Sequence, residues 1–276
     1  MKSDLIVSGG GMLRLFEGGS LKQVNQTQLG GAGALCTGGG RIYCASERDH
    51  VIWQMDSRTL MPGALLAGGP GMRDLMLSPD GNLLYVLCSD GDSVLMLDAC
   101  AGTPLLLCRA GARPARMALD GGARVLAVAG GRSSSVLLFD AQTLERIAEM
   151  PMPGEVCDVE LHRGAVYALC MSEPMGSVLV GVFPYGMRRT RGLPGLPGAL
   201  LAMGNTVAAA TEDAVHLLDA SELRCRACLR INGRPSRLMA AQARLVCIDQ
   251  YTQRLLEAKR DGCFSVCAQA EDIAPY

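Results

Sequence analysis

Short apolar runs alternate with small clusters of turn-forming residues along the whole chain. Most runs are about five to seven residues long and are separated by Gly, Asp, Asn, Ser or Pro, as between Ser78 and Asp98. Runs of this length with such boundaries are typical of β-strands. Many of them, such as 83–88, are apolar throughout, which favours strands buried on both faces. The pattern therefore predicts an all-β chain whose sheets pack face to face.

This strand pattern repeats in units of nearly equal length. One apolar run in each of several units ends in an aspartate, at Asp56, Asp98, Asp140 and Asp219, and the first three aspartates are equally spaced. Strand-rich units with a period of roughly 40 residues are typical of the blades of a β-propeller. Each terminal aspartate stands where a turn begins, so we expect its carboxylate to accept hydrogen bonds from backbone N–H groups of that turn.

Six full units fit the chain, at 30–69, 70–111, 112–153, 154–194, 195–231 and 232–270. Residues 4–29 supply three more strands, at Leu5–Ser8, Met12–Phe16 and Leu21–Gln28, and residues 271–276 resemble the first strand of a unit. We predict one domain over residues 1–276, a seven-bladed β-propeller of four-stranded antiparallel blades. The N- and C-terminal strands would share a blade and close the ring, because closure removes exposed sheet edges. Six blades with a loose N-terminal hairpin is the alternative.

The segment 69–140 resembles the YVTN-type β-propeller repeat. The residues that carry the resemblance are the Ser78-Pro-Asp-Gly turn, the run Leu84-Tyr-Val, and the strand 94–98, which reads Val-Leu-Met-Leu-Asp. Unit 112–153 is a degraded copy of the same pattern. No Gly-His or Trp-Asp dipeptide occurs, so the repeat is not of the WD40 type. The resemblance implies the fold; propellers of this family include surface-layer, binding and metabolic proteins, so it implies no single function.

Charge and cysteine content narrow the classes of partner. The chain of 276 residues has 26 Lys and Arg against 27 Asp and Glu, so we expect neither nucleic acid nor an anionic membrane as partner. The N-terminal apolar run is short and no run approaches the length of a membrane-spanning helix, so we expect a cytoplasmic protein without a membrane segment. Twelve cysteines are then expected as thiols. Cys225 and Cys228 form a C-x-x-C pair without a second pair at zinc spacing, so we expect no metal and no cofactor, and a redox role for the pair stays open.

Alignment of the first strands of the units places charged residues at one channel-facing position. They are Asp74, Arg116, Asp158, Arg237 and, from the C-terminal strand, Asp272. Three residues earlier in three of these units come Arg113, Glu155 and Arg234, toward one mouth of the channel. One interpretation is that opposite charges on neighbouring blades pair, because an unpaired buried charge is costly. The other is a polar funnel whose arginines (113, 116, 234 and 237) hold an anionic ligand or a partner's carboxylate.

The sequence favours a non-enzymatic binding or scaffold propeller. Its partner would be a protein or peptide, or a small anionic ligand bound at the channel mouth. The alternative is a hydrolase or lyase of the lactonase or streptogramin-lyase type, with Glu155 or Asp158 as the acid–base group and a cation to stabilise an oxyanion. A structural subunit of a larger enzyme is a third possibility. No motif marks a catalytic residue.

Overall fold

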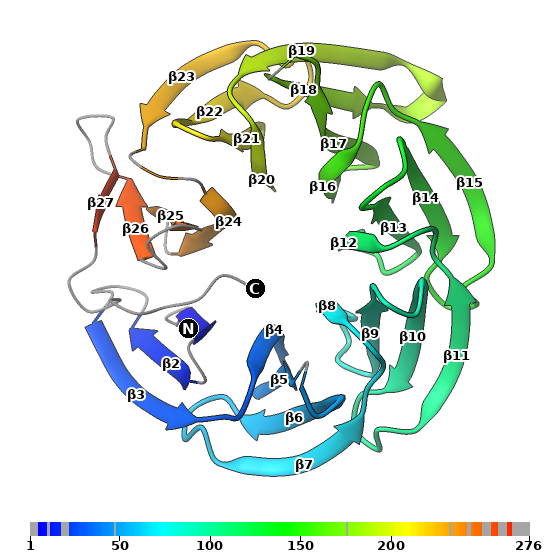
Figure 1. Ribbon diagram of the computed structural model, residues 1–276, viewed down its shortest axis with the longest axis vertical. Helices are drawn as coiled ribbons and strands as arrows, with labels where there is room; N and C mark the ends of the chain where they lie inside the picture. The colour runs from blue at the N-terminus through cyan, green and yellow to red at the C-terminus, as the bar shows by residue number, and fades with distance from the viewer. Residues whose placement is uncertain are drawn as a thin grey trace.

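Seven antiparallel sheets surround a central axis in the computed structural model (Figure 1). The structure describes residues 5–9, 12–17, 22–46, 48–174, 176–231, 233, 235–241, 244–249, 255–258 and 264–266. The predicted seven-bladed β-propeller is therefore confirmed. Within these residues the one helical segment is the single 3-10 turn η1 (Pro184–Gly186), and no helix has the length and apolar character needed to cross a membrane.

Six blades have four strands each, and in each of them the first strand lies nearest the axis while the later strands follow outward (Figure 1). Their strands are β4–β7 (Ala32–Gly38, Arg41–Ser46, Val51–Asp56, Pro62–Ala67), β8–β11 (Met72–Leu77, Leu83–Cys88, Ser93–Asp98, Pro104–Arg109), β12–β15 (Pro114–Leu119, Val125–Gly130, Ser135–Asp140, Arg146–Pro151), β16–β19 (Val156–His162, Ala165–Ser172, Gly176–Val182, Arg188–Pro194), β20–β23 (Pro197–Met203, Thr206–Thr211, Ala214–Asp219, Cys225–Arg230) and β24–β27 (Pro235–Ala241, Arg244–Asp249, Leu255–Ala258, Phe264–Val266). Each blade falls inside one of the six predicted units.

The N-terminal strands form the seventh blade. They are β1 (Leu5–Gly9), β2 (Met12–Glu17) and β3 (Lys22–Gln28), which pair in that order and lie between blades β24–β27 and β4–β7 in Figure 1. The alternative of six blades with a loose hairpin is therefore wrong. The C-terminal strand predicted at 271–276 to complete this blade lies outside the described residues.

The hydrophobic core lies between adjacent blades. One buried cluster, for example, joins Tyr43 and Ile52 of blade β4–β7 to Leu75, Leu84 and Val86 of blade β8–β11. Tyr85 and Leu87, on the other face of the same strand, pack against blade β12–β15, so this second strand contacts a neighbouring sheet on both faces. This explains why runs such as 83–88 are apolar throughout instead of alternating.

The aspartates that end the third strands shape the turns that follow them, as predicted. The Asp140 Oδ1 accepts backbone N–H bonds from Gln142 and Thr143, both at 2.9 Å. Asp56, Asp98 and Asp219 accept the corresponding pairs of bonds in their own blades. These bonds hold the pKa values of the Asp56 and Asp140 carboxyls below the ordinary range, because they stabilise the ionised form.

The same turns connect neighbouring blades through tyrosines. The Tyr85 hydroxyl on β9 donates to the carbonyl oxygen of Ala141, the residue after Asp140 in the next blade, at 2.8 Å. Tyr43 and Tyr167 make the equivalent bonds to Ala99 and Ala220, each at 2.9 Å. The tyrosine of the repeat therefore links neighbouring blades by a hydrogen bond, and the terminal aspartate stabilises the turn whose carbonyl oxygen accepts that bond.

Candidate functional site

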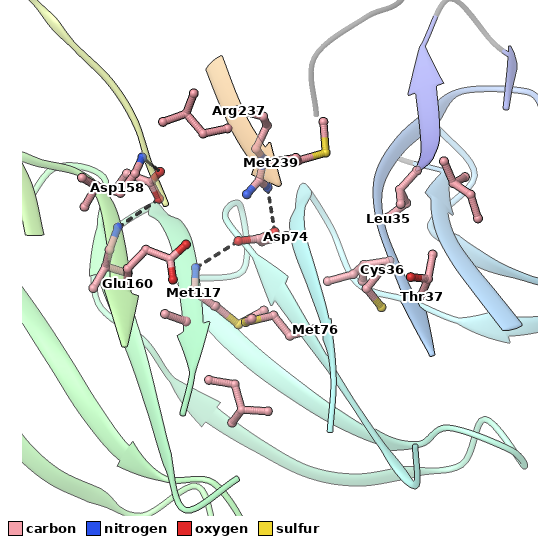
Figure 2. A pocket seen from close by; sticks show the side chains of 17 residues that line it. Leu35, Cys36, Thr37, Asp74, Met76, Met117, Asp158, Glu160, Arg237 and Met239 are labelled. Carbon is pink, nitrogen blue, oxygen red and sulfur yellow. Dashed lines mark hydrogen bonds and ion pairs between the residues drawn. The ribbon is translucent and has the colours of Figure 1, made fainter. Parts of the chain in front are cut away.

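Four of the predicted channel residues form a layer of charge across the central channel. The Arg237 Nη2 lies 2.8 Å from Asp74 Oδ1, and the Arg116 Nε lies 3.9 Å from Asp158 Oδ1. Figure 2 shows the first pair, with Arg237 on β24 reaching Asp74 on β8. Arg116 and Asp158 are on neighbouring blades, as expected. Asp74 and Arg237 are on blades that are not neighbours, so for this pair the prediction was wrong: the long guanidinium side chain crosses the channel.

The two aspartates of this layer also join inner strands. The Asp74 Oδ2 accepts the backbone N–H of Met117 on the next blade at 3.0 Å, and Asp158 Oδ2 accepts that of Leu200 at 2.7 Å. The pairing register shifts between Met72 and Asp74, and again between Val156 and Asp158, so each aspartate sits at an irregularity of its strand. The aspartates of this layer therefore also connect neighbouring blades through hydrogen bonds to the backbone.

Burial and neighbouring charges act on this layer in opposite directions. Burial raises the pKa of the Asp158 carboxyl, and the charges of Arg116 and Arg237 oppose that rise. Burial lowers the pKa of the Arg116 guanidinium, and the like charges of Arg237 and Arg73 lower it further. The positive charges of Arg237 and Arg73 therefore destabilise the charged form of Arg116, and the negative charges of Asp158 and Asp74 stabilise it.

Asp74, Asp158 and Arg237 of this layer also line a cavity of about 340 Å³, which we call the deep cavity (Figure 2). Most of the side chains that line it are apolar or contain sulfur, among them Leu35, Cys36, Met76, Leu119, Leu200 and Met239. The polar side chains in its wall are Thr37, the charged Asp74, Asp158 and Arg237, and Glu160 on β16. The Glu160 carboxyl group makes no hydrogen bond to any residue that the structure describes. Burial, and secondarily the charge of Asp158, raises the pKa of Glu160 to about 8, although Arg237 acts in the other direction.

A second cavity, of about 440 Å³, lies at the mouth of the channel where the inner strands begin. Four arginines, Arg73, Arg113, Arg116 and Arg132, line this mouth cavity together with Ser89. No acidic side chain is among the described residues that form its wall. Arg116 also pairs with Asp158, and guanidinium groups that converge in this way can bind an anion.

Two local features bring these arginines together. Arg113 has a left-handed backbone conformation, with φ of 48°, and its N–H donates to the Asp92 carboxylate at 2.7 Å. The N–H of Gly131 donates to the Arg113 carbonyl at 3.0 Å, so the β13–β14 turn that carries Arg132 packs against Arg113. A Cβ at Gly131 would collide with that carbonyl oxygen, so this close approach requires glycine.

The predicted site residues thus fall into separate groups. Arg113 and Arg116 line the mouth cavity, while Asp74, Asp158 and Arg237 line the deep cavity. Glu155 is exposed and lines neither cavity. Arg234 and Asp272 lie outside the described residues.

Sequence reasoning missed Arg73, Arg132 and Glu160. Glu160 had a usable signal, because it stands two positions after Asp158 on the same strand and side chains alternate between faces with that period. Arg73 and Arg132 had no such signal. Arg73 precedes Asp74 directly and so lies on the opposite face of its strand, and Arg132 is in a turn.

The C-x-x-C pair lies away from both cavities, on the outer strand β23. Cys225 and Cys228 are exposed free thiols. Across the described part of the chain, no group of three His, Cys, Asp or Glu side chains is placed to hold a metal ion.

Comparisons with known proteins identify the fold and no family. No family model matches the chain, and no curated protein matches its sequence. Among solved structures, a functionally unknown protein from Desulfotomaculum acetoxidans superposes with a TM-score of 0.84 at 15% identity, over 99% of this chain and 98% of that one. Hydrazine synthase of Kuenenia stuttgartiensis gives a TM-score of 0.74 at 14% identity, over 85% and 78%. The dihydro-heme d1 dehydrogenase NirN, in complex with DHE, gives 0.68 at 15% identity, over 94% of this chain and 62% of NirN.

Proposed function

We propose that this protein is a binding propeller whose channel mouth takes the carboxylate or phosphate group of a ligand. The observation that carries the proposal is the mouth cavity, which four arginines line and to whose wall no described acidic side chain contributes. Guanidinium groups bind such anions with paired, charge-assisted hydrogen bonds. The lowered pKa of Arg116 gives further support, because part of it comes from like charges that a bound anion would offset.

The size of the cavity fits a small ligand or the end of a chain. Its volume of about 440 Å³ is within the range of roughly 300 to 1,000 Å³ typical of small-molecule pockets. Two sources present the required chemistry, namely a small multivalent anion and the terminal carboxylate of a protein or peptide partner. Both remain part of the proposal, since they share the group that the arginines would bind.

Titration calorimetry at low ionic strength tests the proposal. The probes are citrate, inorganic phosphate, and one short peptide in two forms, with a free and with an amidated C-terminus. We expect binding of at least one anionic probe to weaken at least tenfold in Arg113→Gln and Arg132→Gln. Arg146→Gln serves as the matched control, because Arg146 is an exposed arginine on the outer strand β15.

The outcome of this titration distinguishes a small ligand from a partner's carboxylate. A preference for the small anions identifies a small ligand, and a preference for the free peptide over its amide identifies a partner's carboxylate. Binding that is equal in the wild type and both mouth variants, or no binding of any anionic probe, would overturn the proposal.

The location and family belong to the same proposal. Exposed free thiols such as Cys100, Cys225 and Cys228 suit a reducing compartment, which supports the cytoplasm. The repeat signature at 69–140 supports membership of the YVTN-type propellers.

A hydrolase or lyase is the second candidate. The observation that favours it is the contact of 3.9 Å between Arg116 and Asp158, which brings a carboxylate beside a cation that can stabilise an oxyanion. A panel of lactones and esters, assayed with and without divalent metal, tests it. Turnover that is lost in Asp158→Asn would favour the enzyme, and absence of turnover across the panel would exclude these substrates.

A further inference from the structure

The deep cavity holds a carboxyl group that nothing in the proposed function uses. Glu160 extends from β16 into the cavity, where Figure 2 shows its carboxyl group among the side chains that line the channel. It makes no hydrogen bond or ion pair with any described residue, whereas Asp158 on the same strand accepts backbone N–H bonds from Val159 and Leu200. A carboxyl group held in a cavity without a hydrogen-bond partner among the described residues costs free energy, so its presence there points to a ligand.

The surroundings of Glu160 indicate the charge of that ligand. Burial is the largest cause of the raised pKa of Glu160. The negative charges of Asp158 and Asp74 raise this pKa further, and the positive charge of Arg237 lowers it. Two of these three neighbouring charges are therefore negative. Each aspartate already has an arginine partner: Asp74 pairs with Arg237, and Asp158 with Arg116. Of the described carboxyl groups in this part of the channel, Glu160 is then the one without an arginine partner, and a cation would balance its ionised form.

The wall of the cavity indicates the rest of the ligand. Cys36, Met76, Leu119, Leu200 and Met239 offer apolar or polarisable surface, and the volume of about 340 Å³ is near the lower end of the range for ligand pockets. A bare inorganic ion would leave most of this space empty. A molecule with an apolar body fills it.

We propose that the deep cavity binds a small organic ammonium ion, whose N–H groups donate to the Glu160 carboxylate and whose hydrocarbon part packs against the methionines and leucines of the inner strands. The inference is independent of the anion site at the mouth. The two cavities lie on opposite sides of the charged layer and use different residues, Arg73, Arg113 and Arg132 above it and Glu160 below it.

Binding of an ammonium ion is coupled to proton release. Glu160 must ionise to pair with the ligand, so below about pH 8 its proton passes to solvent on binding. Among the described residues, the other titratable groups that face it are Asp158 on its own strand, Asp74 on β8, Arg237 on β24 and Cys36 on β4. The two aspartates are paired with arginines. Burial raises the pKa of the Cys36 thiol, so that thiol stays protonated in this range.

Three probes with one hydrocarbon chain test the proposal by calorimetry at pH 8.5: hexylammonium, 1-hexanol and hexanoate. We expect the wild type to bind hexylammonium most tightly and hexanoate least. Glu160→Gln should weaken hexylammonium binding at least tenfold and leave 1-hexanol binding unchanged. Glu145→Gln, a substitution of an exposed glutamate in the β14–β15 turn, is the matched control and should bind as the wild type does.

Several results would overturn the proposal. They are absence of hexylammonium binding to the wild type, equal binding by Glu160→Gln, and tighter binding of hexanoate than of hexylammonium. If Glu160→Gln fails to fold, the pH profile of the wild type decides instead. Its affinity for hexylammonium should rise more than tenfold from pH 6.5 to pH 8.5, and a flat profile contradicts the role of Glu160.

A cross-check separates this site from the proposed function. Arg132→Gln should lose affinity for the anionic probes and keep its affinity for hexylammonium. Glu160→Gln should show the reverse, so either proposal can fail while the other stands.

Discussion

The pair formed by Asp74 and Arg237 across the channel gives the sharpest prediction about stability. The Asp74 side chain is only 6% exposed and that of Arg237 is 22% exposed, with 2.8 Å between them. Removing one partner of a buried pair costs about 3–5 kcal/mol, because the other charge is left without compensation. Arg237 keeps some contact with solvent, so we expect Asp74→Asn to lower the free energy of unfolding by about 2–3 kcal/mol.

A double-mutant cycle isolates the interaction. Asp74→Asn, Arg237→Gln and the double variant are compared by urea unfolding, and the coupling energy should be about 1.5–2 kcal/mol, since the double variant leaves no orphaned charge. The asparagine introduced by Asp74→Asn retains an oxygen that can accept the N–H of Met117, so the inter-blade bond at 3.0 Å is not the main loss.

The control cycle uses Arg146 and Glu149, which are 3.4 Å apart but 61% and 52% exposed. Solvent screens such a pair, and its coupling should not exceed about 0.5 kcal/mol. A coupling energy for Asp74 and Arg237 that equals the control value would refute the reasoning that burial makes the channel pair important.

Three further predictions concern the blades and the thiols. Tyr85→Phe should lower the free energy of unfolding by about 1–2 kcal/mol, and Tyr43→Phe by less, because Gln54 still donates to the Ala99 carbonyl at 3.0 Å; urea unfolding compares the two. Gly131→Val should lower the melting temperature by several degrees and weaken citrate binding, since the new side chain collides with Arg113; calorimetry measures both, and an unchanged affinity contradicts the assigned packing. In the native protein a thiol reagent should modify the exposed cysteines (100, 225 and 228) fast and the buried ones (44, 88, 170 and 247) only after unfolding. The reason is that burial blocks access and raises the pKa of the Cys44 and Cys170 thiols to about 12 and that of Cys88 to about 11. Equal rates of modification for the two sets contradict this.

Much of the fold was predictable from the sequence because blades are local structures. Strands within a blade are joined by short turns, so the run lengths and the turn residues near Ser78 and Asp98 set their order. The even spacing of the terminal aspartates then gave the blade boundaries. The blade count followed from the N-terminal strands 5–28, which the structure places in the ring.

The candidate site was predictable only in part. Alignment of the first strands of the units identified Asp74, Arg116, Asp158 and Arg237 as neighbours in the channel, because equivalent positions on successive blades face the same axis. The same reasoning assumed that pairs form between adjacent blades. It therefore missed the reach of Arg237 across the channel to Asp74.

The sequence by itself determined the repeat, the strands and the layer of alternating charge, since these depend on the period of a strand and the period of a blade. Only the tertiary structure decided how that layer divides the channel. Closing the ring leaves Glu160 in the deep cavity on one side and collects Arg73, Arg113 and Arg132 on the other. The physical reason is that burial, electric field and cavity shape depend on side chains from blades far apart in sequence, which meet only around the closed axis.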